Sequence, residues 1–548
     1  MASVTFFGTT MTYLASTEFP SSLNQGEVVW MLALGFVFSF ILAFGLGAND
    51  VANSFATSVG AGVLTLRQVC VLAAIFETAG AVLLGSKVSD TIRKGIFDVT
   101  LYDGMEETLM LGQVAALGGA MIWMLVATLC KLPVSGTHSI VGAMVGFHVV
   151  VFQFSGINWK QLAMIVASWF ISPLMSGVLS AVVFAIYRYF VLKKDNPLKN
   201  GLRSLPICYA AVMFVNFLSI FMHAPQMLRL DKVPVWAGII ISLVIGFVVG
   251  LGVWLLVIPR VKKTLGLADG PSDEKPKFSV GDGDEEKRIS MEEMNCNNSN
   301  DNNKEPMNGG DGKGYSNLKE SPNGVQYSFE NEGISGCWPL RKMRRQEYSR
   351  HASVASTTAL TGKRKLPKRD SEAWKSIQDP AGVAELCGPL QILSAIFAAF
   401  AHGGNDVSNA IGPLIALWAI FQSGGVEQKQ APPIWILVYG GVGMTIGLCM
   451  LGRRVIETVG TNLTPMTPSS GFTIELGAAS TVLLASNLGI PVSTTHCKVG
   501  SIVAIGYTRS KANVEWKLFR SIILAWIVTV PCAALLSAGL MWILLFSI

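Results

Sequence analysis

Long apolar runs, each about as long as a membrane-spanning helix, limit most strongly how this chain can fold. Such a helix needs roughly 20 predominantly apolar residues. Hydrophobic residues make up 51% of the 548 positions, and mean hydropathy is +0.47, which is too apolar for a soluble protein of this size. We therefore predict an all-α polytopic membrane protein with about twelve segments, at 28–47, 68–88, 110–131, 139–154, 161–191, 207–223, 235–258, 389–412, 433–452, 472–488, 491–507 and 519–547.

Charged residues concentrate in one block, 260–385, which is also rich in Asn, Ser and Gly. Such a composition cannot bury enough apolar surface to fold alone, so it predicts a disordered linker. Three parts follow: an N-terminal membrane half (1–259), the linker (260–385) and a C-terminal membrane half (386–548). The basic end of the linker either rests on anionic lipid or forms a solvated tether. Basic residues before Ser290 and Ser353 resemble kinase sites.

The net charge of +6 comes from loops, so no nucleic-acid partner is expected. Nine scattered cysteines without a CxxC spacing indicate neither a disulfide framework nor a zinc site. No cofactor is predicted. A homodimer stays an open alternative.

The distribution of Lys and Arg predicts the topology, because these residues are retained on the cytoplasmic side. The first 66 residues contain neither, which places the N-terminus outside. Threading twelve segments then puts the linker in the cytoplasm and both termini outside. The short segments near 133–150 and 491–507 are either spanning or re-entrant.

A polar heptad with a carboxylate occurs twice, each time at the end of an apolar run. The copies read GANDVAN at 47–53 and GGNDVSN at 403–409, an offset of 356 residues. A carboxylate inside a bilayer usually marks an ion path, although Asp50 and Asp406 could instead cap helices. Flexible Gly beside Asn and Asp lets a helix break and turn oxygens inward. We therefore predict a duplicated cation site suited to sodium.

A second motif repeats as PVSGTH at 133–138 and PVSTTH at 491–496, an offset of 358 residues. Proline fits the first turn of a helix, so the following hydroxyl and N–H groups would point outwards at a positive helix end. Such an end is a cradle for a phosphate-type anion. Since neither motif contains Lys or Arg, bound cations and dipoles must balance the anion. We interpret His138 and His496 as hydrogen-bonding structural residues, with direct contact to the substrate as the alternative.

The two repeated units are predicted to be inverted. On the threaded topology, Asp50 ends a segment that enters from outside, and Asp406 lies towards the far end of one that enters from inside. Inverted repeats with broken or re-entrant helices bind substrate and ions near the membrane midplane. Two further acids, Glu77 and Glu475, lie within apolar runs and are functional candidates for the same reason as the aspartates.

The heptads, the two Ser/Thr/His turns and TPSSGF at 467–472 resemble the inorganic phosphate transporter family, closest to the animal sodium-dependent phosphate transporters. The resemblance covers nearly all of both membrane halves. It implies sodium-driven phosphate uptake at the plasma membrane, and some relatives also serve as retroviral receptors. It matches Glu77 and Glu475 to acids needed for transport. It places around sodium Asn49, Asp50, Asn405, Asp406, Ser135 and Ser493, and around phosphate Asn53, Asn409, Ser135, Gly136, Thr137, Ser493, Thr494 and Thr495.

Two alternatives were weighed against a sodium–phosphate symporter. A proton-coupled or metal-phosphate transporter would change only the driving ion. An intramembrane aspartyl protease also needs two membrane acids. We disfavour the protease because inverted repeats would place Asp50 and Asp406 in separate half-sites. The expected protein is therefore a transporter and not an enzyme, with sodium as its only metal.

Overall fold

The computed structural model describes residues 2–6, 9–13, 24–223, 233–264, 377–380, 382–426, 432–487, 493–509 and 513–547. These residues belong to one compact unit formed from both halves of the chain. Most of the predicted linker, including Ser290 and Ser353, lies outside the described residues. Its two ends differ from the prediction, because a helix continues to Thr264 and another begins at Val383.

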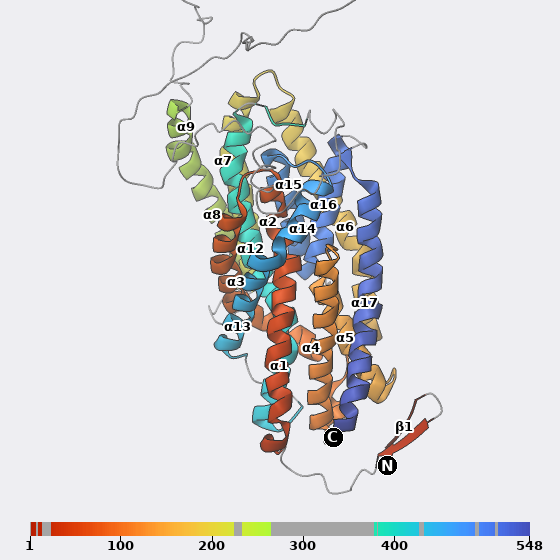
Figure 1. Cartoon of the computed structure of the whole chain (residues 1–548). Coiled ribbons are helices and arrows are strands. Elements are labelled where there is room, and N and C mark those ends of the chain that lie inside the picture. The colour runs from red at the N-terminus through yellow and green to blue at the C-terminus, as the bar shows by residue number, and fades with distance from the viewer. Residues whose placement is uncertain are drawn as a thin grey trace, which may run out of the picture. The chain divides into compact units, whose positions relative to one another are not determined.

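Helices form most of the first half, where apolar side chains can cover long helix surfaces (Figure 1). Side-chain oxygens of Asn24 and Asn158 accept N–H groups at the starts of α1 and α6. The elements are α1 (Gln25–Leu46), η1 (Gly47–Val51), α2 (Ala52–Gly60), α3 (Leu66–Lys94), η2 (Val99–Tyr102), α4 (Glu106–Leu129), α5 (Gly136–Phe152), α6 (Trp159–Tyr187), η3 (Arg188–Leu192), α7 (Pro197–His223), α8 (Val235–Gly252), η6 (Val253–Val257) and α9 (Ile258–Thr264).

The second half begins with the longest described helix, which carries the second heptad in its interior. Gly382 and Gly424, both with positive φ, flank this helix, as expected where the chain must turn sharply. The elements are α12 (Val383–Ser423), α13 (Ile434–Gly447), η7 (Leu448–Gly452), α14 (Arg453–Glu457), η8 (Thr458–Asn462), α15 (Pro468–Asn487), α16 (Thr494–Arg509), α17 (Trp516–Leu544) and η10 (Leu545–Ser547).

The all-α prediction omitted a short N-terminal hairpin. Strands β1 (Ala2–Phe6) and β2 (Thr9–Tyr13) pair antiparallel, with Ala2 opposite Tyr13. Apolar runs do not reveal this hairpin, because its short strands are rich in Ser and Thr.

Nine helical stretches among the described residues are long and apolar enough to cross a membrane, and α5 is a shorter apolar helix. Each of the twelve predicted segments overlaps a helix. Ten of these helices are the nine long stretches and α5, and the other two are α15 and α16. Outward-facing apolar side chains, such as Phe247 (69% exposed) on α8, fit a lipid-facing surface. The described part of the chain is therefore a helical membrane protein.

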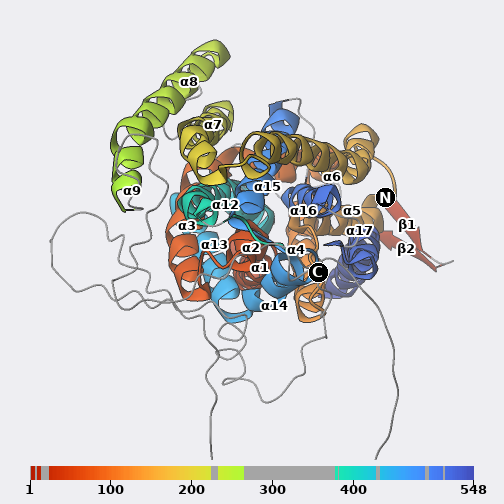
Figure 2. The same cartoon turned by 90° about the horizontal axis from the view of Figure 1, so that it is seen from above.

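The helices of the two halves pack in an exchanged pattern. Helix α5 of the first half lies against α17 of the second, and α16 of the second lies against α6 of the first, whereas α1 packs on α4 and α12 on α15 within one half. Figure 1 shows α1 and α12 running in opposite directions, and Figure 2 shows α12, α15 and α16 inside a ring of other helices. This arrangement brings both heptads and both Ser/Thr turns into one central region.

Candidate functional site

The first heptad lies in a π-helical turn, η1, between α1 and α2. The helix therefore widens at this point. The prediction required it to break, and it does not. Gly47 is needed for packing, because a Cβ there would overlap the backbone carbonyl of Met444 on α13. A π-helical turn replaces the regular hydrogen bonds of an α-helix, which is frequent at functional sites. The prediction was wrong about the break but correct in finding an irregular helix.

The second heptad lies inside continuous α12, so here too the predicted break is absent. Gly403 faces the backbone carbonyl of Glu77 on α3, where a Cβ would overlap that carbonyl. The glycines thus allow two helix backbones to approach closely. Continuous helices can therefore carry Asp50 and Asp406 into the protein interior, where the side chains are 1% and 3% exposed.

The two Ser/Thr turns begin helices, as predicted. Ser135 is the N-cap of α5 and accepts the N–H of His138 at 3.4 Å, and Ser493 accepts the N–H of His496 at 3.3 Å. Pro133 lies two residues before the N-cap, so placing it in the first helical turn was wrong. Its carbonyl instead accepts the Trp526 indole N–H at 3.0 Å. Both helix starts still present hydroxyl groups at a positive helix end.

Asp50 joins the two turns. Its Oδ2 accepts the backbone N–H of Gly136 at 3.0 Å, at the start of α5. Its Oδ1 accepts the hydroxyl of Thr495 at 2.9 Å, in the first turn of α16. A Cβ at position 136 would meet the end of the Leu46 side chain and crowd the Asp50 carboxylate, so glycine keeps this contact close. One carboxylate therefore contacts the Ser/Thr turns of both halves.

Asp406 occupies a related position. Its Oδ1 accepts the Asn409 amide at 2.8 Å, and its Oδ2 accepts the Thr494 hydroxyl at 3.3 Å. The Asn409 amide also donates to Thr137 at 3.1 Å. Since Thr494 and Thr495 are adjacent, both aspartates converge on one turn. The argument that they lie in separate half-sites was wrong.

The three other heptad asparagines have different surroundings. Asn49 holds the turn before α5: its Oδ1 accepts the N–H of Val134 at 3.0 Å, and its Nδ2 donates to the carbonyl of Leu132 at 2.9 Å. Asn405 is partly exposed beside Asp406. In the second half, positions 490 and 492 correspond to Leu132 and Val134, and both lie outside the described residues, as does the side chain of Asn53.

Glu77 reaches the site through a histidine that sequence reasoning missed. His402 lies between two acids, with Nε2 at 2.5 Å from Asp406 Oδ2 and Nδ1 at 3.2 Å from Glu77 Oε2. Glu77 Oε1 is buried without a partner. The separation of four residues between His402 and Asp406 on one helix was a signal that could have found half of this contact.

Glu475 forms a separate buried cluster. Its carboxylate accepts hydroxyl groups from Thr57 at 2.5 Å, from Ser58 at 3.4 Å and from Ser394. Lys498, 6% exposed on α16, interacts electrostatically with it. Lys498 stands two residues beyond the PVSTTH motif, so the predicted charge balance, which rested on the motif alone, did not include it. Among the described residues, the region around the heptads and turns therefore carries the carboxylates of Asp50, Asp406 and Glu77 with the imidazole of His402. The neighbouring cluster pairs Glu475 with the ammonium of Lys498.

The two motif histidines pack against each other, which the prediction did not foresee. Their ring centroids are 4.8 Å apart, and His496 stacks on Trp526 at 3.8 Å. Both ring nitrogens of His496 and Nδ1 of His138 are buried without a hydrogen bond. The hydrogen-bonding role assigned to His496 was therefore wrong, and aromatic packing takes its place.

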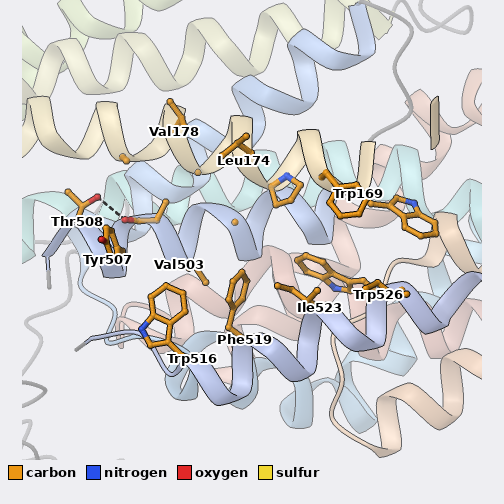
Figure 3. A pocket seen from close by; sticks show the side chains of 17 residues that line it. Trp169, Leu174, Val178, Val503, Tyr507, Thr508, Trp516, Phe519, Ile523 and Trp526 are labelled. Atoms are coloured by element: carbon orange, nitrogen blue, oxygen red, sulfur yellow. Dashed lines mark hydrogen bonds between the residues drawn. The ribbon is translucent and has the colours of Figure 1, made fainter. Parts of the chain in front are cut away.

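Trp526 also lines a cavity of about 580 Å³ between α6, α16 and α17 (Figure 3). Its wall is almost entirely apolar and includes Leu174, Val503 and Phe519. No charged side chain lines it. An ion therefore has no charged partner among these lining residues, and the polar region around Asp50 and Asp406 remains the candidate site.

The protein is a helical membrane bundle in which two buried carboxylates contact two hydroxyl-bearing helix starts. This combination defines the class of an ion-coupled membrane transporter. Residues 46–537 match the model of the phosphate transporter family. The chain belongs to this family.

Curated relatives agree over nearly the full length. The chain is 40% identical to sodium-dependent phosphate transporter 1-A of Danio rerio, with 94% of this chain and 95% of the relative covered. It is 39% identical to sodium-dependent phosphate transporter 2 of Xenopus tropicalis, with 95% and 99% covered. A solved structure of a sodium-dependent phosphate transporter is 29% identical and superposes with a TM-score of 0.65, covering 95% of this chain and 100% of that one.

Proposed function

We propose that this protein is a secondary active symporter that imports inorganic phosphate with the sodium gradient. The observation that carries the proposal is the Asp50 carboxylate, which accepts hydrogen bonds from both Ser/Thr turns. Carboxylate oxygens suit sodium, and N–H and hydroxyl groups at helix starts suit phosphate. Membership of the phosphate transporter family supports the same substrate.

The hydrogen bonds explain how the two substrates would be coupled. Gly136 and Thr495 donate to Asp50, and Thr494 donates to Asp406, so these donors are engaged by carboxylates. Sodium bound to the carboxylates would compensate their charge. The same N–H and hydroxyl groups could then donate hydrogen bonds to phosphate. Phosphate would in turn balance the sodium charge. Each substrate then raises the affinity for the other, as reciprocal linkage requires.

The residues divide accordingly. Asp50 and Asp406 are sodium ligands, and oxygens of Asn405, Ser135 and Ser493 complete the coordination of sodium. Asn49 has a different role, because it holds the turn before α5 through Val134 and Leu132. The phosphate ligands are Gly136, Thr137, Thr494, Thr495, Asn409 and Asn53, with the hydroxyls of Ser135 and Ser493. Glu77 acts through His402, and Glu475 through its contacts with Thr57 and Ser394.

The membrane arrangement is proposed to consist of twelve segments in two inverted repeats at the plasma membrane. The exchanged packing of α5 on α17 and α16 on α6 supports the repeats. In Figure 1, α1 begins and α17 ends at one end of the bundle, while α9 ends and α12 begins at the other. This supports a cytoplasmic linker, with α1 beginning and α17 ending on the outer side. The homodimer and the linker kinase sites remain predictions.

Proton coupling is the second candidate, and one observation favours it. His402 contacts both Glu77 and Asp406, and histidine is the side chain that most readily exchanges protons near neutral pH. A proton on this bridge would alter the charge beside the site. The driving ion therefore has to be measured directly.

The test uses purified protein in liposomes loaded with potassium, with uptake of radiolabelled phosphate from sodium or choline buffer at fixed pH. Uptake that requires sodium, and that a sodium ionophore abolishes, is expected. An excess of arsenate should compete, and sulfate should not. Equal uptake in choline under an inward proton gradient would replace the sodium proposal by proton coupling.

A further inference from the structure

A second cavity, of about 430 Å³, lies where α6 and η3 meet the end of α16. Arg188, Lys193 and Arg509 line it, and Asp379 is the acid on its wall. Three cationic side chains thus face one carboxylate. The other lining residues are Phe184, Leu192, Ile377, Gln378, Pro380 and Asn513, none of which belongs to the central site.

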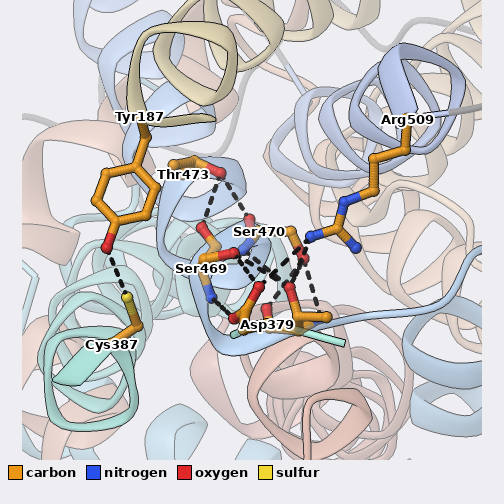
Figure 4. Close-up of polar contacts among 8 residues, drawn as sticks. Tyr187, Asp379, Cys387, Ser469, Ser470, Thr473 and Arg509 are labelled. Carbon is orange, nitrogen blue, oxygen red and sulfur yellow. Dashed lines mark hydrogen bonds and ion pairs between the residues drawn. The ribbon is translucent and has the colours of Figure 1, made fainter. Parts of the chain in front are cut away.

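The carboxylate in this cavity is already engaged by a helix. Asp379, 2% exposed, accepts the backbone N–H of Ser469 at 2.8 Å and the Ser469 hydroxyl at 2.5 Å (Figure 4). Ser469 is the second residue of α15, so the acid sits at the positive start of that helix. The helix therefore compensates part of the Asp379 charge, which increases the cationic excess in the cavity.

Arg509 is only partly satisfied. Its Nη2 donates to the Thr467 hydroxyl at 2.7 Å and lies 3.9 Å from Asp379 Oδ1. Its guanidinium is 4.9 Å from the centre of the Phe184 ring, and its Nη1 is buried without a partner. A buried donor of a charged group without a partner is costly. An acceptor in the cavity would remove that cost.

Two neighbouring groups strengthen the same conclusion. Arg188 uses its Nη1 to donate to the carbonyl of Thr508 at 3.2 Å, which holds its guanidinium beside the cavity. Asn513 is 3% exposed, and its Oδ1, which can only accept, has no hydrogen bond, so a protonated oxygen of a phosphate group can donate to it. The wall thus offers two guanidinium groups, an ammonium and a buried amide with an unpartnered atom.

We propose that this cavity binds a phosphate-type anion, either inorganic phosphate or the phosphomonoester headgroup of a lipid. Guanidinium groups match phosphate oxygens with paired donors, and the cationic excess selects against neutral ligands. Residues 377–380, which precede α12, form one wall of the cavity. An anion bound here would tie the end of the linker to α6, α15 and α16, outside the central site.

The first experiment measures binding of radiolabelled inorganic phosphate to the purified full-length protein in detergent, in choline buffer without sodium. Arg188→Gln and Arg509→Gln are each expected to raise Kd at least about tenfold, because each removes a charged donor. Asp379→Asn should lower Kd several-fold, since it removes the opposing charge. Lys517→Gln, an exposed residue on α17, is the matched control and should leave Kd unchanged.

The lipid arm places the protein in nanodiscs of phosphatidylcholine with or without phosphatidic acid and identifies retained lipid by native mass spectrometry. Phosphatidic acid retained by the parent protein and lost from Arg188→Gln identifies a lipid headgroup as the ligand. Binding of phosphate in detergent identifies the free anion. If neither ligand binds, or if Arg188→Gln and Asp379→Asn leave binding unchanged, the proposal is wrong.

The design separates this cavity from the proposed symport. Asp50→Asn, in the central site, is expected to abolish sodium-driven uptake, whereas the Kd change of Arg188→Gln is measured without sodium, so the two proposals can fail separately. Arg509→Lys, which keeps the charge, controls for unfolding and is expected to give an intermediate Kd. Melting temperatures of all variants are measured alongside.

Discussion

The hydroxyl of Thr495 donates a 2.9 Å hydrogen bond to the carboxylate of Asp50, although the two residues lie 445 positions apart in the chain. The next residue back, Thr494, donates to Asp406 at 3.3 Å. A single turn at the start of α16 therefore contacts the acids of both heptads. A change at either acid should consequently affect both substrates.

Asp50→Asn and Asp406→Asn should each abolish sodium-dependent phosphate uptake while surface abundance is kept. Asparagine keeps the shape of the side chain but removes the charge that holds a cation. Uptake per surface-biotinylated molecule is the measurement, with exposed Asp103→Asn as the control. Near-normal uptake by both site variants would contradict a paired cation site.

Thr495→Val should raise the apparent KM for phosphate roughly 10- to 100-fold, because a hydrogen bond to a charged group contributes about 1.5 to 3 kcal/mol. Thr495→Ser keeps the hydroxyl and should restore most of the affinity. Thr508→Val, whose hydroxyl only contacts the carbonyl of Ala504, serves as the control on the same helix. An unchanged KM in Thr495→Val would remove this hydroxyl from the phosphate site.

His402→Gln should lower the maximal rate of sodium-driven uptake by at least about tenfold. Glutamine cannot be protonated, and it lacks the two ring nitrogens with which His402 contacts both Glu77 and Asp406. His148→Gln, which alters contacts with Tyr102 and Ser155 outside the site, should retain uptake per folded molecule. If His402→Gln abolished a proton-driven uptake present in choline buffer, the coupling ion would be the proton.

Gly403→Ala should destabilise the protein by about 1 to 3 kcal/mol, because a Cβ would meet the backbone of Glu77, which cannot move aside easily. Gly252→Ala is the control, since open space surrounds that position on α8. The alanine there should be neutral or stabilising by up to about 1 kcal/mol. Thermal unfolding in detergent compares the two, and equal melting temperatures would refute the close approach of α3 and α12.

Deletion of residues 275–365 should preserve sodium-coupled phosphate uptake per surface molecule. The deletion leaves the heptads, both turns and the contact between Asp379 and Ser469 in place. Abundance or regulation can change, because the kinase-type sites at Ser290 and Ser353 are removed. A deletion variant that reaches the surface without transporting phosphate would assign the linker a part in transport.

The amino-acid sequence by itself determined the helical membrane class, the positions of the apolar helices and the duplicated acids. These features follow from local properties, since the lengths of apolar runs and the repeated motifs can be read directly from one amino-acid sequence. It also placed the helix starts at Ser135 and Ser493, because hydroxyl side chains favour N-caps. The local sequence did not determine the backbone conformation of the heptads. Gly47 and Gly403 pack closely on neighbouring helices, and this tertiary packing keeps their own helices continuous.

Only the tertiary structure decided which groups meet. The contacts of Asp50 with Thr495, of Glu77 with His402 and of Glu475 with Ser394 join helices that are distant in sequence. No spacing rule predicts such pairs, because they depend on how α3, α12, α15 and α16 pack. The charge balance of the site was decided in the same way, since packing brings Lys498 to Glu475 and His402 between two acids. Side chains buried in a bilayer must find partners within the protein, and the fold determines which partners are within reach.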